Sequence, residues 1–149
     1  MGQLIVRQAM LEDAPGIAKV LVEGWKATYA RILQKSFLDS FNYATHESFT
    51  RQHLQALPAS CAVLVAIEAA EVVGVASLKD ADPPLTGSTA ELDALYVLPS
   101  RQHEGIGTRL LLASARWLTR RRRDSLVLWV LRDNPYRRFY SKYGGRAGR

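Results

Sequence analysis

The chain has 149 residues and a mass of 16.6 kDa, and this length argues for one domain spanning residues 1–149. Hydrophobic residues make up 48% of the chain and charged residues 23%, which excludes a mostly disordered protein. A single cysteine, Cys61, excludes an internal disulfide framework and a structural zinc site built on several thiolates.

The net charge of +6 is distributed unevenly along the chain. Residues 1–100 carry 7 basic and 11 acidic side chains (net −4), whereas residues 101–149 carry 13 basic and 3 acidic ones (net +10). We therefore expect an anion to bind the C-terminal third, and a nucleotide cofactor, a nucleic acid or an acidic membrane would each fit. No apolar run reaches the roughly 18 residues of a membrane helix, and residues 1–10 do not resemble a signal peptide, so we expect a cytoplasmic protein.

The N-terminal third predicts a strand followed by helices. Residues 3–8 favour a strand, and apolar residues then recur at helical spacing from Glu12 to about Tyr29. Residues 34–57 predict two further short helices. The predicted apolar face of the second of these comprises Phe49, His53, Leu54 and Leu57.

The rest of the chain predicts strands interrupted by one long helix. Residues 61–68 and 71–79 favour a hairpin, residues 89–98 a further strand, residues 105–120 a helix and residues 125–131 an apolar strand. A last short helix begins at Asn134. Ideal alternation in the strand over residues 89–98 places Leu92, Ala94, Tyr96 and Leu98 on one face and Glu91, Asp93, Leu95 and Val97 on the other. The order predicts one mixed α/β domain, a central mixed sheet flanked by helices.

The strongest functional signal is the segment PSRQHEGIG between a strand and a helix. Gly105 and Gly107 flank the start of the helix, and their lack of side chains lets an anion approach the free N–H groups of the first turn. The helix dipole and Arg101 add positive charge, so the segment predicts a diphosphate cradle. The segment lacks the Gly-Lys-Ser/Thr of a P-loop, and Leu110 stands where a dinucleotide fingerprint needs a glycine. The alternative is two glycines in an ordinary strand-to-helix turn.

Three segments together resemble the GNAT N-acetyltransferases. Gln102-x-x-Gly105-x-Gly107, after a strand ending in Leu95-Tyr96-Val97, resembles the acetyl-CoA-binding motif of that family. Residues 134–144, with an Asn, a Phe-Tyr pair and a Gly, resemble its later motif, and residues 25–29 (WKATY) its first helix. The resemblance covers nearly the whole chain, with the segments in the family's order.

The resemblance implies an enzyme that transfers an acetyl group from acetyl-CoA to a primary amine, by direct attack in a ternary complex and without a metal. The cofactor would lie between two parallel strands that splay apart, those predicted over residues 89–98 and 125–131. Backbone groups would bind the pantetheine arm, and one N–H group would polarise the thioester carbonyl. The implied cofactor-binding residues are Leu95, Tyr96, Val97, Arg101, Gln102, Gly105, Ile106, Gly107, Thr108 and Asn134.

The resemblance also implies the catalytic groups. Tyr140 matches the general-acid tyrosine that protonates the departing thiolate, although a core aromatic residue is the alternative. Glu91 lies 11 residues before Gln102, where the histone-acetylating branch has a glutamate that acts as base through water. Asn134 would bind pantetheine or cap the last helix.

The sequence says less about the residues that would bind the acceptor amine. Glu91 and Asp93 suit an ammonium-binding entrance or a solvated strand face, and Trp25 and Tyr29 would line the acceptor pocket or belong to the core. The acceptor class stays open, and the resemblance would allow a small-molecule or peptide amine, such as a polyamine or an aminoglycoside. The alternatives to an enzyme are a non-catalytic acyl-CoA-binding or regulatory module, and a basic nucleic-acid-binding module using residues 116–138.

The C-terminal end departs from the family pattern. Members usually continue past the last helix with two more strands, whereas this sequence ends six residues after Tyr143. We therefore expect the usual C-terminal strands to be missing and the strand over residues 125–131 to lie at an open edge. A homodimer formed by strand pairing or exchange would cover that edge.

Overall fold

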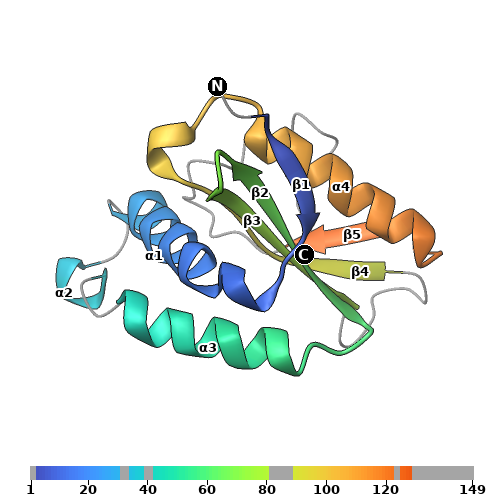
Figure 1. Ribbon diagram of the computed structural model, residues 1–149, viewed down its shortest axis with the longest axis horizontal. Coiled ribbons are helices and arrows are strands. Elements are labelled where there is room, and N and C mark those ends of the chain that lie inside the picture. The colour runs from blue at the N-terminus through green and yellow to red at the C-terminus, as the bar shows by residue number, and fades with distance from the viewer. Residues whose placement is uncertain (1–2, 31–33, 39–41, 81–88, 123–124, 129–149) are drawn as a thin grey trace.

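A computed structural model describes residues 3–30, 34–38, 42–80, 89–122 and 125–128, with the backbone alone at residues 37–38, 89 and 125–128 (Figure 1). None of the helices within these ranges is long and apolar enough to cross a membrane. The elements are β1 (Ile5–Gln8), the 3-10 turn η1 (Leu11–Asp13), α1 (Ala14–Tyr29), α2 (Lys35–Leu38), α3 (Tyr43–Gln55), β2 (Cys61–Glu68), β3 (Glu71–Asp80), β4 (Thr89–Val97), η2 (Pro99–Arg101), α4 (Ile106–Arg120) and β5 (Ser125–Leu128).

The five described strands form one mixed sheet in the order β1-β2-β3-β4-β5. The first four strands pair antiparallel, whereas β5 runs parallel to β4 and pairs with it from Thr89 to Leu92. Figure 1 shows this sheet with helices packed around it. The mixed α/β architecture predicted from the element order is therefore confirmed.

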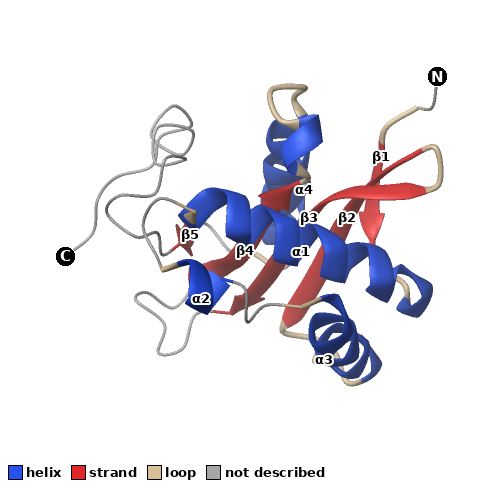
Figure 2. Cartoon of the chain, turned by 90° about the vertical axis from the view of Figure 1, so that its left-hand side faces the viewer, coloured by secondary structure: helices blue, strands red, loops and turns tan. Residues whose placement is uncertain are grey.

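The helices cover both faces of the sheet. On one face, Gly24 of α1 lies so close to β4 that a Cβ atom there would be 2.8 Å from Cδ1 of Tyr96. On the other face, a Cβ atom at Gly74 would be 2.9 Å from Cδ1 of Leu110 in α4. Figure 2 shows α1 in front of the strands and α4 farther back. Apolar side chains from both faces form the core, including Ile17, Val65, Val75, Leu78 and Leu110, all at most 2% exposed.

A β-bulge in β4 makes the predicted alternation of residues 89–98 wrong. Ala94 is opposite Ser77 of β3, but Leu92 is opposite Leu78, so Asp93 is an extra residue in the register. Directly opposed residues share a face, and consecutive ones alternate, so Leu92 and Ala94 lie on opposite faces. Because of the bulge, Glu91 lies on the α1 face together with Ala94 and Tyr96.

The predicted inward face of α3 is also wrong in part. Phe49 is 62% exposed and His53 is exposed, whereas Thr50 is buried and Leu54 and Leu57 are half-buried. The spacing of Thr50, Leu54 and Leu57 is itself helical, so the buried face is turned by about one residue and takes in a threonine. Burial by α1 and the neighbouring elements, which a hydrophobicity pattern does not contain, decides this rotation.

The predicted hairpin between β2 and β3 is confirmed, with Glu68 opposite Glu71 across a two-residue turn. Both turn residues, Ala69 and Ala70, have positive φ angles, 52° and 63°. A two-residue turn with two positive φ angles suits the right-handed twist of the strands, but it favours Asn and Gly. The chain therefore makes the hairpin with residues that have poor turn propensity.

Candidate active site

Two hydrogen bonds, one from a backbone N–H and one from a side chain, attach the loop between β4 and α4 to the sheet. The Leu98 N–H donates to the Val73 carbonyl at 2.9 Å, which continues the β3–β4 contact past the end of β4. The Gln102 side chain turns back, and its Nε2 donates to the Val97 carbonyl at 2.9 Å. Gln102, the first residue of the predicted motif, thus fixes where the following glycines lie.

The start of α4 is open. Gly105 is the N-cap residue, with a φ angle of 82°, and apart from its two chain neighbours no described residue has a heavy atom within 4 Å of the point where a Cβ atom would be. The glycine is needed for the left-handed backbone and offers no side chain to cap the N–H groups of the first turn. The helix begins at Ile106, one residue later than predicted. This N-terminus has the geometry of an anion site.

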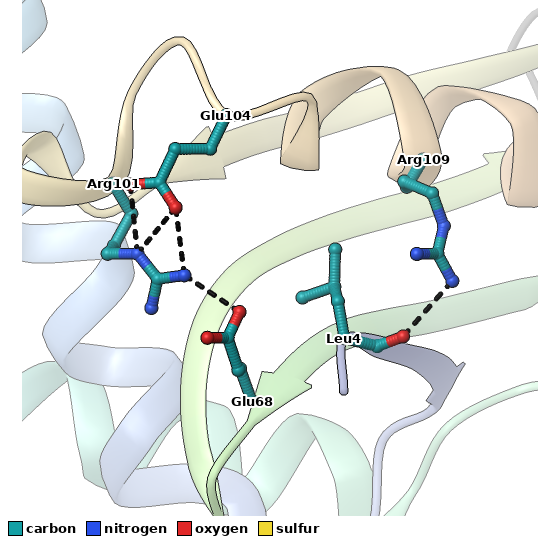
Figure 3. A network of polar contacts seen from close by, with 5 residues as sticks. All are labelled: Leu4, Glu68, Arg101, Glu104 and Arg109. Atoms are coloured by element: carbon teal, nitrogen blue, oxygen red, sulfur yellow. Dashed lines mark hydrogen bonds and ion pairs between the residues drawn. The ribbon is translucent and has the colours of Figure 1, made fainter. Parts of the chain in front are cut away.

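Arg101 is bound by two carboxylates, which the sequence did not reveal (Figure 3). Its Nε lies 3.1 Å from both Glu104 carboxylate oxygens, and its Nη2 lies 2.9 Å from Oε1 of Glu104 and 2.8 Å from Oε2 of Glu68. Hydrogen bonds to Glu104 and Glu68 raise the pKa of Arg101, and the bond to Arg101 lowers the pKa of Glu104. The positive charge predicted beside the helix is therefore compensated within the protein.

A second arginine connects α4 to the first strand. Nη2 of Arg109 donates to the Leu4 carbonyl at 3.2 Å (Figure 3). Leu4 directly precedes β1, at the opposite side of the sheet from β5. This hydrogen bond links α4, whose N-terminus is the candidate anion site, to the residue before the edge strand β1.

Glu91 and Asp93 meet at one ammonium group. Nζ of Lys79 on β3 lies 3.1 Å from Oε2 of Glu91 and 3.9 Å from Oδ1 of Asp93. The Glu91 side chain is only 15% exposed, whereas that of Asp93 is 55% exposed. The hydrogen bond to Glu91 and the charges of both carboxylates raise the pKa of Lys79. Both carboxylates thus contact the Lys79 ammonium, whereas the prediction had placed them on one face by strand alternation, which the bulge at Asp93 interrupts.

The predicted acceptor-side residues Trp25 and Tyr29 lie in the last turns of α1. The rings of Trp25 and Tyr29 lie with their centroids 4.5 Å apart, tilted by 50°. Tyr29 is buried and Trp25 half-buried, and both follow Gly24, which packs on Tyr96. The aromatic pair thus lies at the C-terminal end of α1, the helix that covers the sheet face on which Glu91 lies.

The described pairing of β4 with the parallel strand β5 runs from Thr89 to Leu92. It therefore ends before the residues predicted to bind the pantetheine arm, Leu95 to Val97, which form the last part of β4. Asn134, Tyr140 and residues 129–131 of the predicted strand lie outside the described residues.

The basic end of α4 is partly used inside the protein. Arg121 contacts Asp80 through Nη2 at 3.2 Å, donates from Nη1 to the Ala59 carbonyl at 2.8 Å and lies 5.1 Å from the Trp117 ring centroid. These contacts fasten the helix end to the sheet. Arg123 lies outside the described residues.

Comparison with known proteins identifies the family. The model of the acetyltransferase (GNAT) family matches residues 26–144. The chain is 36% identical over 139 residues to YuaI, an uncharacterised N-acetyltransferase of Bacillus subtilis (strain 168), covering 93% of this chain and 78% of YuaI. It is 27% identical over 146 residues to a spermidine N(1)-acetyltransferase of Thermoplasma acidophilum, covering 93% and 86% of the two chains.

Solved structures agree on the fold. The PaiA N-acetyltransferase of Thermoplasma acidophilum, in complex with coenzyme A, matches with a TM-score of 0.77 and 24% identity over 96% of this chain and 89% of that one. The chain therefore belongs to the acetyltransferase (GNAT) family. Membership confirms the predicted resemblance, the fold class and the class of enzyme, an acyltransferase.

Proposed function

We propose that the protein transfers the acetyl group of acetyl-CoA to a primary amine, by direct attack in a ternary complex. The observation that supports it most is the open N-terminus of α4, which follows closely after the end of β4, where Leu95 to Val97 are predicted to bind the pantetheine arm. An anionic end and an extended arm of one ligand would fit these two features together. The coenzyme A complex of the PaiA structure supports the same ligand class.

The residues present fit acetyl-CoA. The space beside Gly105, which any side chain would fill, admits a diphosphate to the N–H groups between Gln102 and Thr108. Backbone groups of Leu95, Tyr96 and Val97 would bind the pantetheine arm, and Asn134 is a further proposed contact. Acetyl-CoA supplies an activated acyl group as its thioester.

The protein's own groups would handle the protons. Glu91, nearly buried on the α1 face, would accept a proton from the acceptor ammonium, directly or through water. Tyr140, outside the described residues, would give a proton to the departing sulfur. An N–H group of the β4 stretch would polarise the carbonyl.

A cationic amine is the acceptor class that we propose. The Asp93 carboxylate is exposed and lies 3.9 Å from the Lys79 ammonium. It could therefore also attract the ammonium group of an acceptor from solution. Trp25 and Tyr29 would contact the aliphatic part of the acceptor. The similarity to a spermidine N(1)-acetyltransferase points to polyamines as the first acceptors to test.

The proposal is tested by turnover. Purified protein is incubated with acetyl-CoA and, separately, spermidine, a lysine-containing peptide and an aminoglycoside, and release of the free thiol is followed. We expect acceptor-dependent thiol release with spermidine, together with N-acetylspermidine detected by mass spectrometry. Binding of acetyl-CoA without release by any amine would favour the non-catalytic acyl-CoA module instead.

A further inference from the structure

Arg101 faces away from the side of β4 where the cofactor arm would run. Its Nη2 reaches Glu68, the last residue of β2, whereas the cofactor arm is proposed to lie on the side of β4 where β5 pairs. In the order of the sheet, β2 and β5 lie on opposite sides of β4. The guanidinium is thus committed to the β2–β3 hairpin.

The charges around Arg101 also disfavour direct contact with a phosphate. One guanidinium is bound by two carboxylates, and both Nε and Nη2 are engaged at 2.8–3.1 Å. The three side chains together carry a net charge of −1, so an incoming phosphate would have to displace a carboxylate and would be repelled by the other.

Glu104 connects these contacts of Arg101 to the start of α4. It directly precedes Gly105, so its side chain is attached beside the open first turn of α4. Carboxylates are favoured at helix N-termini, where they accept hydrogen bonds from the same N–H groups that would bind a diphosphate. Figure 3 shows the Glu104 side chain turned toward Arg101 and away from that turn.

We propose that Arg101 is a positioning residue: held by Glu68, it binds the Glu104 carboxylate and so keeps the start of α4 open for the cofactor diphosphate. The inference rests on the proposed function and names residues that act on the cofactor site without touching the cofactor. We call the set Arg101, Glu68 and Glu104 the Arg101 clamp. Losing the clamp frees Glu104 to compete as an internal anion.

The experiment is a calorimetric titration of ligand-free protein with coenzyme A. We expect Arg101→Gln to weaken the affinity by about tenfold, and Glu68→Gln to weaken it by a few-fold because Arg101 keeps its contacts to Glu104. The decisive variant is Arg101→Gln combined with Glu104→Gln, which should restore the affinity to within about threefold of the wild type because the competing charge is gone. Glu71→Gln, in the same hairpin and exposed, is the matched control and should change nothing.

Direct binding of the diphosphate by Arg101 would give different affinities for two of these variants. If Arg101 binds the diphosphate directly, Glu68→Gln should tighten binding by releasing the guanidinium, and the Arg101→Gln, Glu104→Gln double variant should stay as weak as Arg101→Gln. Either result overturns the clamp. If Arg101→Gln does not fold, as judged by circular dichroism, the direction of the Glu68→Gln effect decides alone.

Titration of the wild-type protein with coenzyme A distinguishes a failure of the clamp from a failure of the proposed function. Folded wild-type protein that does not bind coenzyme A contradicts the proposed function and the clamp with it. Wild-type protein that binds coenzyme A, with all clamp variants unchanged, contradicts the clamp alone.

Discussion

At the scale of single residues, Glu91 combines features that a base needs. Its side chain is 15% exposed, lies on the α1 face and is 3.1 Å from the Lys79 ammonium, which holds the carboxylate in place. Asp93, two residues later, is far more exposed and lies farther from the same ammonium. The two carboxylates therefore suit different roles.

Substitution should separate these roles. We expect Glu91→Gln to lower kcat by about 10²-fold, the loss typical of removing a general base, with little change in the KM for acetyl-CoA. Asp93→Asn should instead raise the KM for a cationic acceptor and leave kcat nearly unchanged. Steady-state kinetics with varied acceptor measure both. Equal effects of the two variants on kcat would contradict the assignment of the base to Glu91.

Gly105 allows a test of the cradle itself. Asn tolerates a left-handed backbone, and the space around Gly105 is open, so Gly105→Asn should fold normally while placing a side chain in the cradle. We expect coenzyme A affinity to fall at least about tenfold with little change in Tm. Ala69→Asn, at another positive φ angle away from the cradle, is the control. Retained affinity in Gly105→Asn would mean that the diphosphate binds elsewhere.

At the scale of elements, the β2–β3 hairpin is closed by a strained turn. Ala69 and Ala70 both have positive φ angles, which cost about 1–2 kcal/mol for each residue with a Cβ atom. Replacing them with Asn and Gly, the residues preferred in this turn, should raise the free energy of unfolding by about 1 kcal/mol. Thermal unfolding should show a Tm higher by about 2–4 °C. An unchanged or lower Tm would contradict the left-handed turn.

The 3-10 turn η1 before α1 is held by a partly buried ion pair between Arg7 and Asp13. Asp13 is 7% exposed; its Oδ2 accepts from the Met10 N–H at 2.7 Å and from Nη1 of Arg7 at 2.8 Å, and its Oδ1 from Nη2 of Arg7 at 3.1 Å. Burial alone would raise the pKa of Asp13, but the bonds from Arg7 and Met10 lower it below its usual value. The stabilisation is therefore complete above the unfolded pKa and is lost as the pH falls through the folded value.

A charge-neutral variant should show this pH dependence. We expect Asp13→Asn to lower the free energy of unfolding by about 2 kcal/mol at pH 7, because the charged hydrogen bonds to Arg7 are lost. The difference from the wild type should shrink as the pH falls below about 4. Denaturant unfolding at several pH values measures it. A difference that stays constant down to pH 3 would contradict an ionised Asp13.

The elements themselves were predictable where a local pattern determines them. The apolar periodicity of α4 and the β-prone runs of β2 and β3 predict their positions to within about a residue. The bulge at Asp93 and the rotation of α3 toward Thr50 were not predictable, because both depend on how neighbouring elements fit together. The bulge matters most, since it places Glu91 on the α1 face.

At the scale of the whole molecule, folding partly cancels the uneven charge of the sequence. Arg101 and Arg121 belong to the basic C-terminal third, but they pair with Glu68 and Asp80 from the acidic part of the chain. Basic residues counted along the sequence are therefore not all available to an anion. The glycine motif could be recognised from the sequence because its function is local, whereas the clamp joins residues 33 positions apart.

The central claim is that the open start of α4 binds acetyl-CoA, and the most direct measurement is a calorimetric titration of the protein with acetyl-CoA. Free phosphate and a short DNA duplex serve as parallel titrants. We predict saturable one-to-one binding in the micromolar range for acetyl-CoA alone, lost in Gly105→Asn. Folded protein that does not bind acetyl-CoA would contradict this claim. So would protein that binds DNA with a steep salt dependence but does not bind acetyl-CoA.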